Sequence, residues 1–253
     1  MWIKKISDEL EETLILKPIG FYNRLFKKIP APYFGLIGYG SLGIFIAVAL
    51  ILYIVEDPTF SIFEKWISNL SIGPNGSNIF FFLGMTIASP FMLLFHYSLV
   101  NSFYYKTNKI NILLFLYITT SIQSLGSFMA GIFPLNLNKL HGFVGEMYFF
   151  GSWLFYSGLV YLYIIVKGEG GEKLILCGIC SLTVFIFNMA KIYTALTGEL
   201  FPVFPNYFLE WIVYLTFLFS NFRFSLIMLE ERRKAKKKSA KTEPSSHQQL
   251  QEV

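Results

Sequence analysis

Three charged side chains stand alone in or beside long apolar stretches of this sequence, and they are the first candidates for chemistry. Glu146 and Lys191 each lie within such a stretch, and Glu210 opens another. A charged side chain at the membrane centre costs about 2.5 to 3.5 kcal/mol on insertion scales, so each one calls for a partner or a purpose. At about 1.5 Å per helical residue, Glu146 and Lys191 lie at similar depths, roughly 8 Å below one boundary, which allows them to pair.

Two interpretations of these charges stay open. In the first, Glu146 and Lys191 form a buried ion pair that fixes helix register, a role that adds little stability, and Glu210 lies at the interface. In the second, all three belong to a polar pocket open to the external leaflet, which suits a zwitterionic or anionic lipid headgroup. The residues predicted to line this pocket are Asn75, His141, Glu146, Lys191, Tyr193 and Glu210, with Gln123 and Asn188 deeper inside.

Metal and cofactor chemistry find little support in the sequence. The three histidines, His96, His141 and His247, are dispersed, and Cys177 and Cys180 form a lone C-x-x-C inside one apolar segment. We therefore expect no metal and no cofactor, a hydrogen-bonded role within the protein for His96, and small core side chains in the two cysteines. The sequence contains no G-x-S-x-G elbow, P-loop or Rossmann glycine pattern, so enzymatic activity is left open.

The composition predicts a membrane protein. Of 253 residues, 54% are hydrophobic and 19% aromatic, and the mean hydropathy is +0.53. Of the 37 charged residues, 21 lie in the first 30 positions or from Glu230 onward. This distribution excludes a disordered chain, an ordinary soluble enzyme and a disulfide scaffold. The basic cluster after the last apolar segment is explained by membrane topology and anionic lipids, so we expect no nucleic-acid partner.

Six apolar runs are each close to the roughly 20 residues that cross about 30 Å of hydrocarbon. Such runs must be helices, because barrel strands would be about 10 residues long with alternating polarity. We therefore predict an all-α, multi-pass bundle that occupies residues 33–229 as one domain. The predicted spans are Tyr33–Val55, Asn78–Val100, Asn111–Phe133, His141–Val166, Lys173–Leu196 and Tyr207–Leu229.

The Lys and Arg residues of the connections predict the orientation. With six spans and a cytoplasmic N-terminus, 17 of them fall on the cytoplasmic side, and only Lys65 and Lys139 fall on the other. Both termini are thus predicted to be cytoplasmic. Residues 1–32 lack the early apolar core of a signal peptide and form a retained N-terminal segment, and residues 230–253 form a basic, disordered tail.

Two shorter patterns concern packing and modification. Gly126 with Ala130, and Gly43 with Ala47, have the small-xxx-small spacing that lets helices approach closely, here within the bundle. Asn69 begins the sequon Asn-Leu-Ser on the predicted external side and is a candidate for glycosylation. A second sequon, at Asn75, is better explained by a structural turn.

Two motifs carry a family resemblance. The run Ile-Ser-Asn-Leu-Ser-Ile-Gly-Pro-Asn at 67–75, and Gly-Ile-Phe-Pro at 131–134 followed by His141-Gly142, resemble the family catalogued as domain of unknown function 998. That family is similar to the wider six-span group of damage-regulated autophagy modulators and GPI-lipid-remodelling proteins. The resemblance covers about Tyr33 to Leu229. It implies a six-helix bundle with its signature residues on the external or luminal face, and a role in membrane lipids.

The leading functional hypothesis is therefore a protein of the plasma membrane or an endomembrane that binds, remodels or sorts a membrane lipid through the external pocket. A proton- or ion-coupled transporter or channel that uses Glu146, Lys191 and Glu210 is the alternative, since intramembrane charges often mark such pathways. A non-catalytic scaffold with a protein partner is a third. The sequence names neither the lipid nor the oligomeric state.

Overall fold

The computed structural model describes residues 24–26, 28–104, 106–166 and 170–242. In this part of the chain there is no strand, and six helices are long and apolar enough to cross a membrane. The predicted all-α bundle of six spans is thus confirmed, and the chain is a multi-pass integral membrane protein. The helices are α3 (Ala31–Glu56), α4 (Ser77–Tyr104), α5 (Ile110–Ile132), α6 (Asn138–Ile165), α7 (Glu172–Thr197) and α8 (Asn206–Thr242).

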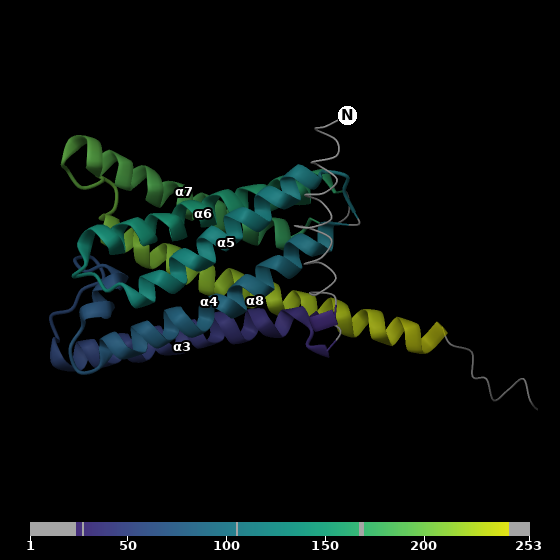
Figure 1. Cartoon of the computed structure of the whole chain (residues 1–253), viewed down its shortest axis with the longest axis horizontal. Coiled ribbons are helices and arrows are strands. Elements are labelled where there is room, and N and C mark those ends of the chain that lie inside the picture. Colours follow the sequence, from purple (N-terminus) through teal and green to yellow (C-terminus); the bar gives the residue numbers. More distant parts are fainter. Residues whose placement is uncertain (1–23, 27, 105, 167–169, 243–253) are drawn as a thin grey trace, which may run out of the picture.

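The six helices form a closed ring. Each packs against the next in the sequence, and α8 closes the ring against α3 (Figure 1). The short 3-10 helix η2 (Ile67–Ile72) lies in the connection between α3 and α4 and packs on α4, α3 and α8. We call the end of the bundle that carries η2 the loop end. The opposite end, where α3 begins and α8 projects beyond the other helices, is the basic end (Figure 1).

The outer face of the ring is apolar. Large side chains such as Ile44, Ile164 and Phe219 are more than 60% exposed in the isolated chain. In water so much exposed apolar surface would be unfavourable, but it suits contact with lipid tails. The bundle therefore contacts membrane lipids over most of its circumference.

The centre of the bundle contains a hydrogen-bonded cluster around His96 of α4. Its Nε2 lies 2.7 Å from the Tyr39 hydroxyl of α3, and its Nδ1 lies 3.0 Å from the Thr120 hydroxyl of α5. The Tyr156 hydroxyl of α6 lies 3.4 Å from the same Nε2 and donates to Asn221 Oδ1 of α8 at 2.9 Å. The cluster ties together five of the six spans, and the prediction that His96 is a hydrogen-bonded bundle residue is confirmed.

Helices α5 and α6 approach each other closely at Gly126. A Cβ atom at this position would lie 2.5 Å from the backbone nitrogen of Tyr148 and 2.8 Å from the carbonyl oxygen of Val144. Only a residue without a side chain allows this contact between two backbones. The small-residue pattern thus marks a tight helix contact here, whereas a Cβ at Gly43 would make an ordinary 3.6 Å contact with Leu218.

The C-terminal part of α8 differs from the prediction. We expected the last span to end at Leu229 and a disordered tail to follow, but the helix continues to Thr242. The reason is local: residues 230–242 are rich in Glu, Arg, Lys and Ala, which have high helix propensity in water. An ion pair of 2.7 Å between Lys173 and Glu231 also fastens this extension to α7. Residues 243–253, and most of the predicted N-terminal segment 1–32, lie outside the described residues.

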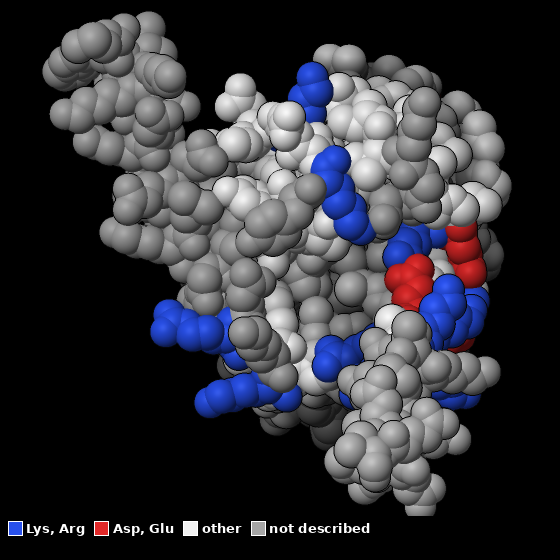
Figure 2. Space-filling view, turned by 90° about the vertical axis from the view of Figure 1, so that its right-hand side faces the viewer, with Lys and Arg blue, Asp and Glu red and all other residues white. Residues whose placement is uncertain are grey.

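Cationic side chains gather at the basic end, as Figure 2 shows for the face from which α8 projects. Three of them, Arg232, Arg233 and Lys236, lie with Pro30 and Tyr33 around one hollow where α8 leaves the bundle. Arg223 of α8 donates to the carboxylate of Glu172, at the start of α7, through Nε at 2.6 Å and Nη2 at 2.9 Å. The concentration of cations here is the basis for predicting that this end is cytoplasmic.

Substitution of Gly126 by alanine tests the α5–α6 contact. We expect Gly126→Ala to lower the free energy of unfolding by about 1 to 3 kcal/mol, because the backbones must separate to admit the methyl group. The midpoint of thermal unfolding of the purified protein in detergent should fall by several degrees. The control Gly43→Ala should leave the midpoint unchanged or slightly raised, and equal midpoints for both variants would contradict the tight contact.

The orientation is testable with single cysteines at exposed loop positions. We expect Glu64→Cys at the loop end to react with a membrane-impermeant maleimide added to intact cells, and Asn108→Cys at the basic end to react only after permeabilisation. Both native positions are exposed, whereas Cys177 and Cys180 are buried and should contribute little background. The opposite pattern of labelling would invert the predicted topology.

Candidate functional site

A cavity of about 240 Å³ lies at the loop end of the bundle. Its walls come from η2 and the residue before it, from α6, from α7 and from the first turn of α8, so segments far apart in the sequence meet there. The lining residues are Trp66, Ser68, Leu135, Asn138, His141, Gly142, Gly145, Phe149, Phe187, Lys191 and Glu210. The cavity therefore combines one cationic, one acidic and several neutral polar groups with aromatic walls, which is the type of lining predicted for the external pocket.

The carboxylate of Glu210 holds the connection between α3 and α4 in place. The side chain is 6% exposed, and its Oε2 accepts a hydrogen bond of 2.9 Å from the backbone N–H of Ile67 at the start of η2. The neighbouring Trp211 donates from Nε1 to the carbonyl oxygen of Lys65 at 2.9 Å. The first turn of α8 thus fastens the loop over the end of the bundle. The carboxylate of Glu210 is therefore buried against η2, a contact that the sequence did not indicate.

His141 is fixed on the opposite wall. Its Nδ1 lies 2.6 Å from the carbonyl oxygen of Phe133, in the loop that precedes α6. Since a carbonyl oxygen only accepts, Nδ1 donates this bond and Nε2 is left for another partner. The same loop is joined to η2 by the backbone N–H of Leu135, which donates to the Ser71 hydroxyl at 2.9 Å.

Two segments that the sequence analysis singled out, residues 67–75 and 131–142, therefore meet at this cavity. Residues 67–75 supply η2, and residues 131–142 supply the loop and first turn of α6 on which η2 rests. Motifs separated by about 60 residues in the sequence form one polar structure at the loop end.

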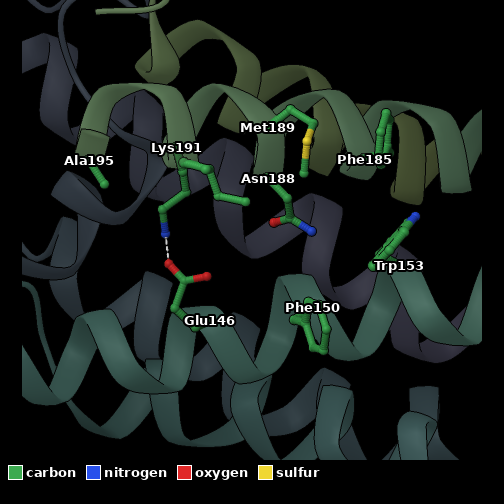
Figure 3. A pocket seen from close by; sticks show the side chains of 9 residues that line it. Glu146, Phe150, Trp153, Phe185, Asn188, Met189, Lys191 and Ala195 are labelled. Carbon is green, nitrogen blue, oxygen red and sulfur yellow. Dashed lines mark hydrogen bonds and ion pairs between the residues drawn. The ribbon is translucent and has the colours of Figure 1, made fainter. Parts of the chain in front are cut away.

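Glu146 of α6 and Lys191 of α7 form the predicted ion pair, from Nζ to Oε1 (Figure 3). The pair is not buried as the first interpretation required. The Glu146 side chain is 53% exposed and that of Lys191 is 31% exposed, so the pair lies towards the outer face of the bundle. Lys191 Nζ also lies 5.6 Å from the ring centre of Phe187. Because both side chains are partly exposed, their charged groups are accessible to a ligand from the outer face.

A second cavity, of about 300 Å³, lies between α6 and α7. We call it the α6–α7 groove. Figure 3 shows the ion pair near one end of the groove, Trp153 and Phe185 at the other, and Asn188 between the two helices. Lys191 lines both this groove and the cavity at the loop end. The full lining of the groove is Glu146, Phe150, Trp153, Phe185, Asn188, Met189, Lys191, Ile192 and Ala195.

Three of the predicted pocket residues line neither cavity. Asn75 is exposed in the turn before α4, where its φ of 54° indicates a conformational role. Tyr193 contacts the ring of Phe201 at a centroid distance of 5.8 Å. Gln123 is fully buried in α5. The structure thus brings His141, Lys191 and Glu210 together, adds Glu146 and Asn188 in the adjoining groove, and leaves the other three elsewhere.

Several residues that line the cavity at the loop end were not predicted, although the sequence contains part of the pattern that marks them. Asn138, Gly142, Gly145 and Phe149 recur with His141 at helical spacings of three or four residues, so they mark one face of α6. The contributions of Trp66 and Ser68 depend on how the η2 loop folds over the bundle, and no local pattern predicts that.

The expected absence of a metal site is not contradicted: over the described ranges, no group of three or more His, Cys, Asp or Glu residues is placed to hold a metal ion. Cys177 and Cys180 are buried, unpaired thiols of α7, in agreement with their predicted role as small core residues. Asn69 of η2 is half-buried, and its Oδ1 is enclosed by the protein.

Comparisons with protein families, with curated proteins and with solved structures find no match for this chain. The functional argument therefore depends on the geometry of the two cavities.

Replacement of Glu210 tests how the loop is held. In Glu210→Ala the N–H of Ile67 loses its acceptor, which costs about 1 to 3 kcal/mol for a buried donor. We expect faster amide hydrogen exchange in residues 67–72, with the exchange of α4 and α5 unchanged. Glu199→Ala, at an exposed carboxylate of the same end, is the matched control. Unchanged exchange at Ile67 in the Glu210 variant would show that the carboxylate does not anchor the loop.

Proposed function

We propose that this membrane protein binds a membrane lipid, with the polar headgroup in the cavity at the loop end and an acyl chain in the α6–α7 groove. The observation that carries the proposal is the position of Lys191, which lines both cavities. A site of this kind combines a few placed polar groups with mostly apolar walls, as ligand pockets usually do.

The charges favour a headgroup that is zwitterionic or anionic. Lys191 supplies a cation for a phosphate group, and Glu146 and Glu210 supply carboxylates for an ammonium or choline group. His141 and Asn138 add hydrogen-bonding capacity on the α6 wall.

The side of the bundle gives access for a lipid. Phe150, Ile192 and Met189 line the groove and are 39% to 52% exposed. In a membrane these side chains face lipid tails, so a lipid is able to enter laterally without crossing the bundle. On the predicted topology, the headgroup lies in the external or luminal leaflet.

A transporter is the second candidate, favoured by the hydrogen-bonded cluster around His96. A titratable group hydrogen-bonded to side chains of three other spans resembles a proton relay. Against this candidate, the ion pair of Glu146 and Lys191 lies towards the outer face, whereas the cluster lies in the bundle centre. A pH-gradient measurement in liposomes separates the two functions, because a lipid-binding protein should leave the gradient intact.

Removal of the charge shared by both cavities tests lipid binding. Mass spectrometry of the lipids retained by the purified protein should show one enriched headgroup class, and Lys191→Met should reduce that enrichment by about tenfold. Lys191→Met leaves Glu146 without its cationic partner, and a carboxyl group in apolar surroundings takes up a proton, so the variant should still assemble, which its thermal midpoint checks. Lys139→Met, at an exposed lysine of the loop end that lines neither cavity, is the matched control. Only bulk lipid on the wild-type protein would refute the proposal.

A further inference from the structure

Asn188 of α7 has an unusual environment in the α6–α7 groove. The residue is 8% exposed and lines the groove, and Figure 3 shows its amide between α6 and α7. Among the described residues, neither Nδ2 nor Oδ1 has a hydrogen-bond partner. Asn188 lies three residues before Lys191, which is one turn of the helix deeper into the membrane and about 4.5 Å along the axis.

An amide left unmet at this depth is costly. A buried polar group without a partner costs about 1 to 3 kcal/mol, and the hydrocarbon outside the bundle offers no substitute. Further along the same interface one polar pair is satisfied across the two helices, because the hydroxyls of Ser157 and Ser181 lie 2.8 Å apart. The amide of Asn188 combines a missing partner with a position in the lining of the groove.

The residues around Asn188 limit the kinds of molecule that can hydrogen-bond to its side-chain amide. Towards the loop end stand the charges of Glu146 and Lys191, and in the other direction stand the rings of Trp153 and Phe185. A molecule that extends along the groove thus has a charged end, then hydrogen-bonding groups at Asn188, then a hydrocarbon chain. At about 300 Å³ the groove is at the small end of ligand pockets, which suits one chain rather than two.

The amide also specifies which hydrogen-bonding groups are needed. Asn188 offers two N–H donors and one carbonyl acceptor, so a ligand that satisfies both atoms must carry an acceptor beside a donor. The ester linkages of a diacyl glycerolipid only accept, and they would leave Oδ1 unmet. An amide linkage with its adjacent hydroxyl, or one ester beside a free hydroxyl, supplies both.

We propose that the α6–α7 groove selects lipids by their linkage region, and that Asn188 recognises a carbonyl acceptor that stands next to an N–H or O–H donor. The inference rests on the proposed lipid-binding function and names the class of lipid. Two sources share this chemistry: amide-linked sphingolipids, and single-chain glycerolipids with a free hydroxyl.

Three lipids with the same phosphocholine headgroup test the inference. Sphingomyelin carries an amide and a hydroxyl, lysophosphatidylcholine carries one ester and a hydroxyl, and phosphatidylcholine carries two esters only. Competition for the delipidated wild-type protein, measured by native mass spectrometry, should favour at least one of the first two over phosphatidylcholine by about tenfold, equivalent to about 1.4 kcal/mol. Preference for one of the two identifies the source of the donor.

The variant Asn188→Leu should abolish this preference while phosphatidylcholine binding stays within about twofold. Because leucine replaces an unmet buried amide at similar volume, the thermal midpoint should stay the same or rise. Gln123→Leu is the matched control: its amide also lacks a partner among the described residues, but it does not line the groove, so the preference should persist. Asn188→Ala provides a second variant if the leucine does not assemble.

The outcomes separate this inference from the proposed function. Equal binding of all three lipids by the wild type, with binding still dependent on Lys191, would overturn linkage selection and leave headgroup binding supported. A preference that survives in both Asn188 variants would overturn the role of the amide. Failure of all three lipids to bind, together with only bulk lipid on the purified protein, would overturn both proposals.

Discussion

The structure depends on one constraint: hydrocarbon supplies no hydrogen-bond partner, so polar groups between the helices must be satisfied by the protein itself. The cluster around His96 meets this constraint by drawing one side chain from each of four other spans, including Tyr39 and Thr120. A helix that shifted along its axis would break contacts with several neighbours at once. The cluster thereby fixes the register of the ring, and the close contact at Gly126 fixes the separation of α5 and α6.

The same constraint shapes the loop end. The connection between α3 and α4 must cross the bundle with its backbone groups satisfied, and it does so by bonding to α8 and to the loop before α6. Glu210 accepts from Ile67, Trp211 donates to Lys65, and Ser71 accepts from Leu135. The loop that these bonds hold forms one wall of the cavity, so its shape follows from backbone requirements as much as from any ligand.

The fold was predictable from the sequence because hydrophobic length determines it directly: each of the six apolar runs became a helix, and the first five lie within a few residues of their predicted ends. The pairing of Glu146 with Lys191 was predictable for a similar reason, since depth follows from residue count. The extension of α8 beyond Leu229 was not predicted, because the polar composition of the tail was taken to indicate disorder. The high helix propensity of its Glu, Arg, Lys and Ala residues was not considered. The positions of Gln123 and Tyr193 were not predictable, because residues at suitable depths still face different directions around the ring.

The exposed ion pair distinguishes between the functional candidates. A relay through the bundle would place its charges in the centre, where the spans meet, as His96 is placed. Glu146 and Lys191 instead lie partly exposed towards the outer face, where contact with the hydrocarbon of lipid tails is unfavourable for charged groups. That position is favourable when the neighbouring molecule brings its own charges to the same depth. A lipid headgroup does so, and the polar atoms of Asn188, one turn deeper, would then meet the linkage region of that lipid.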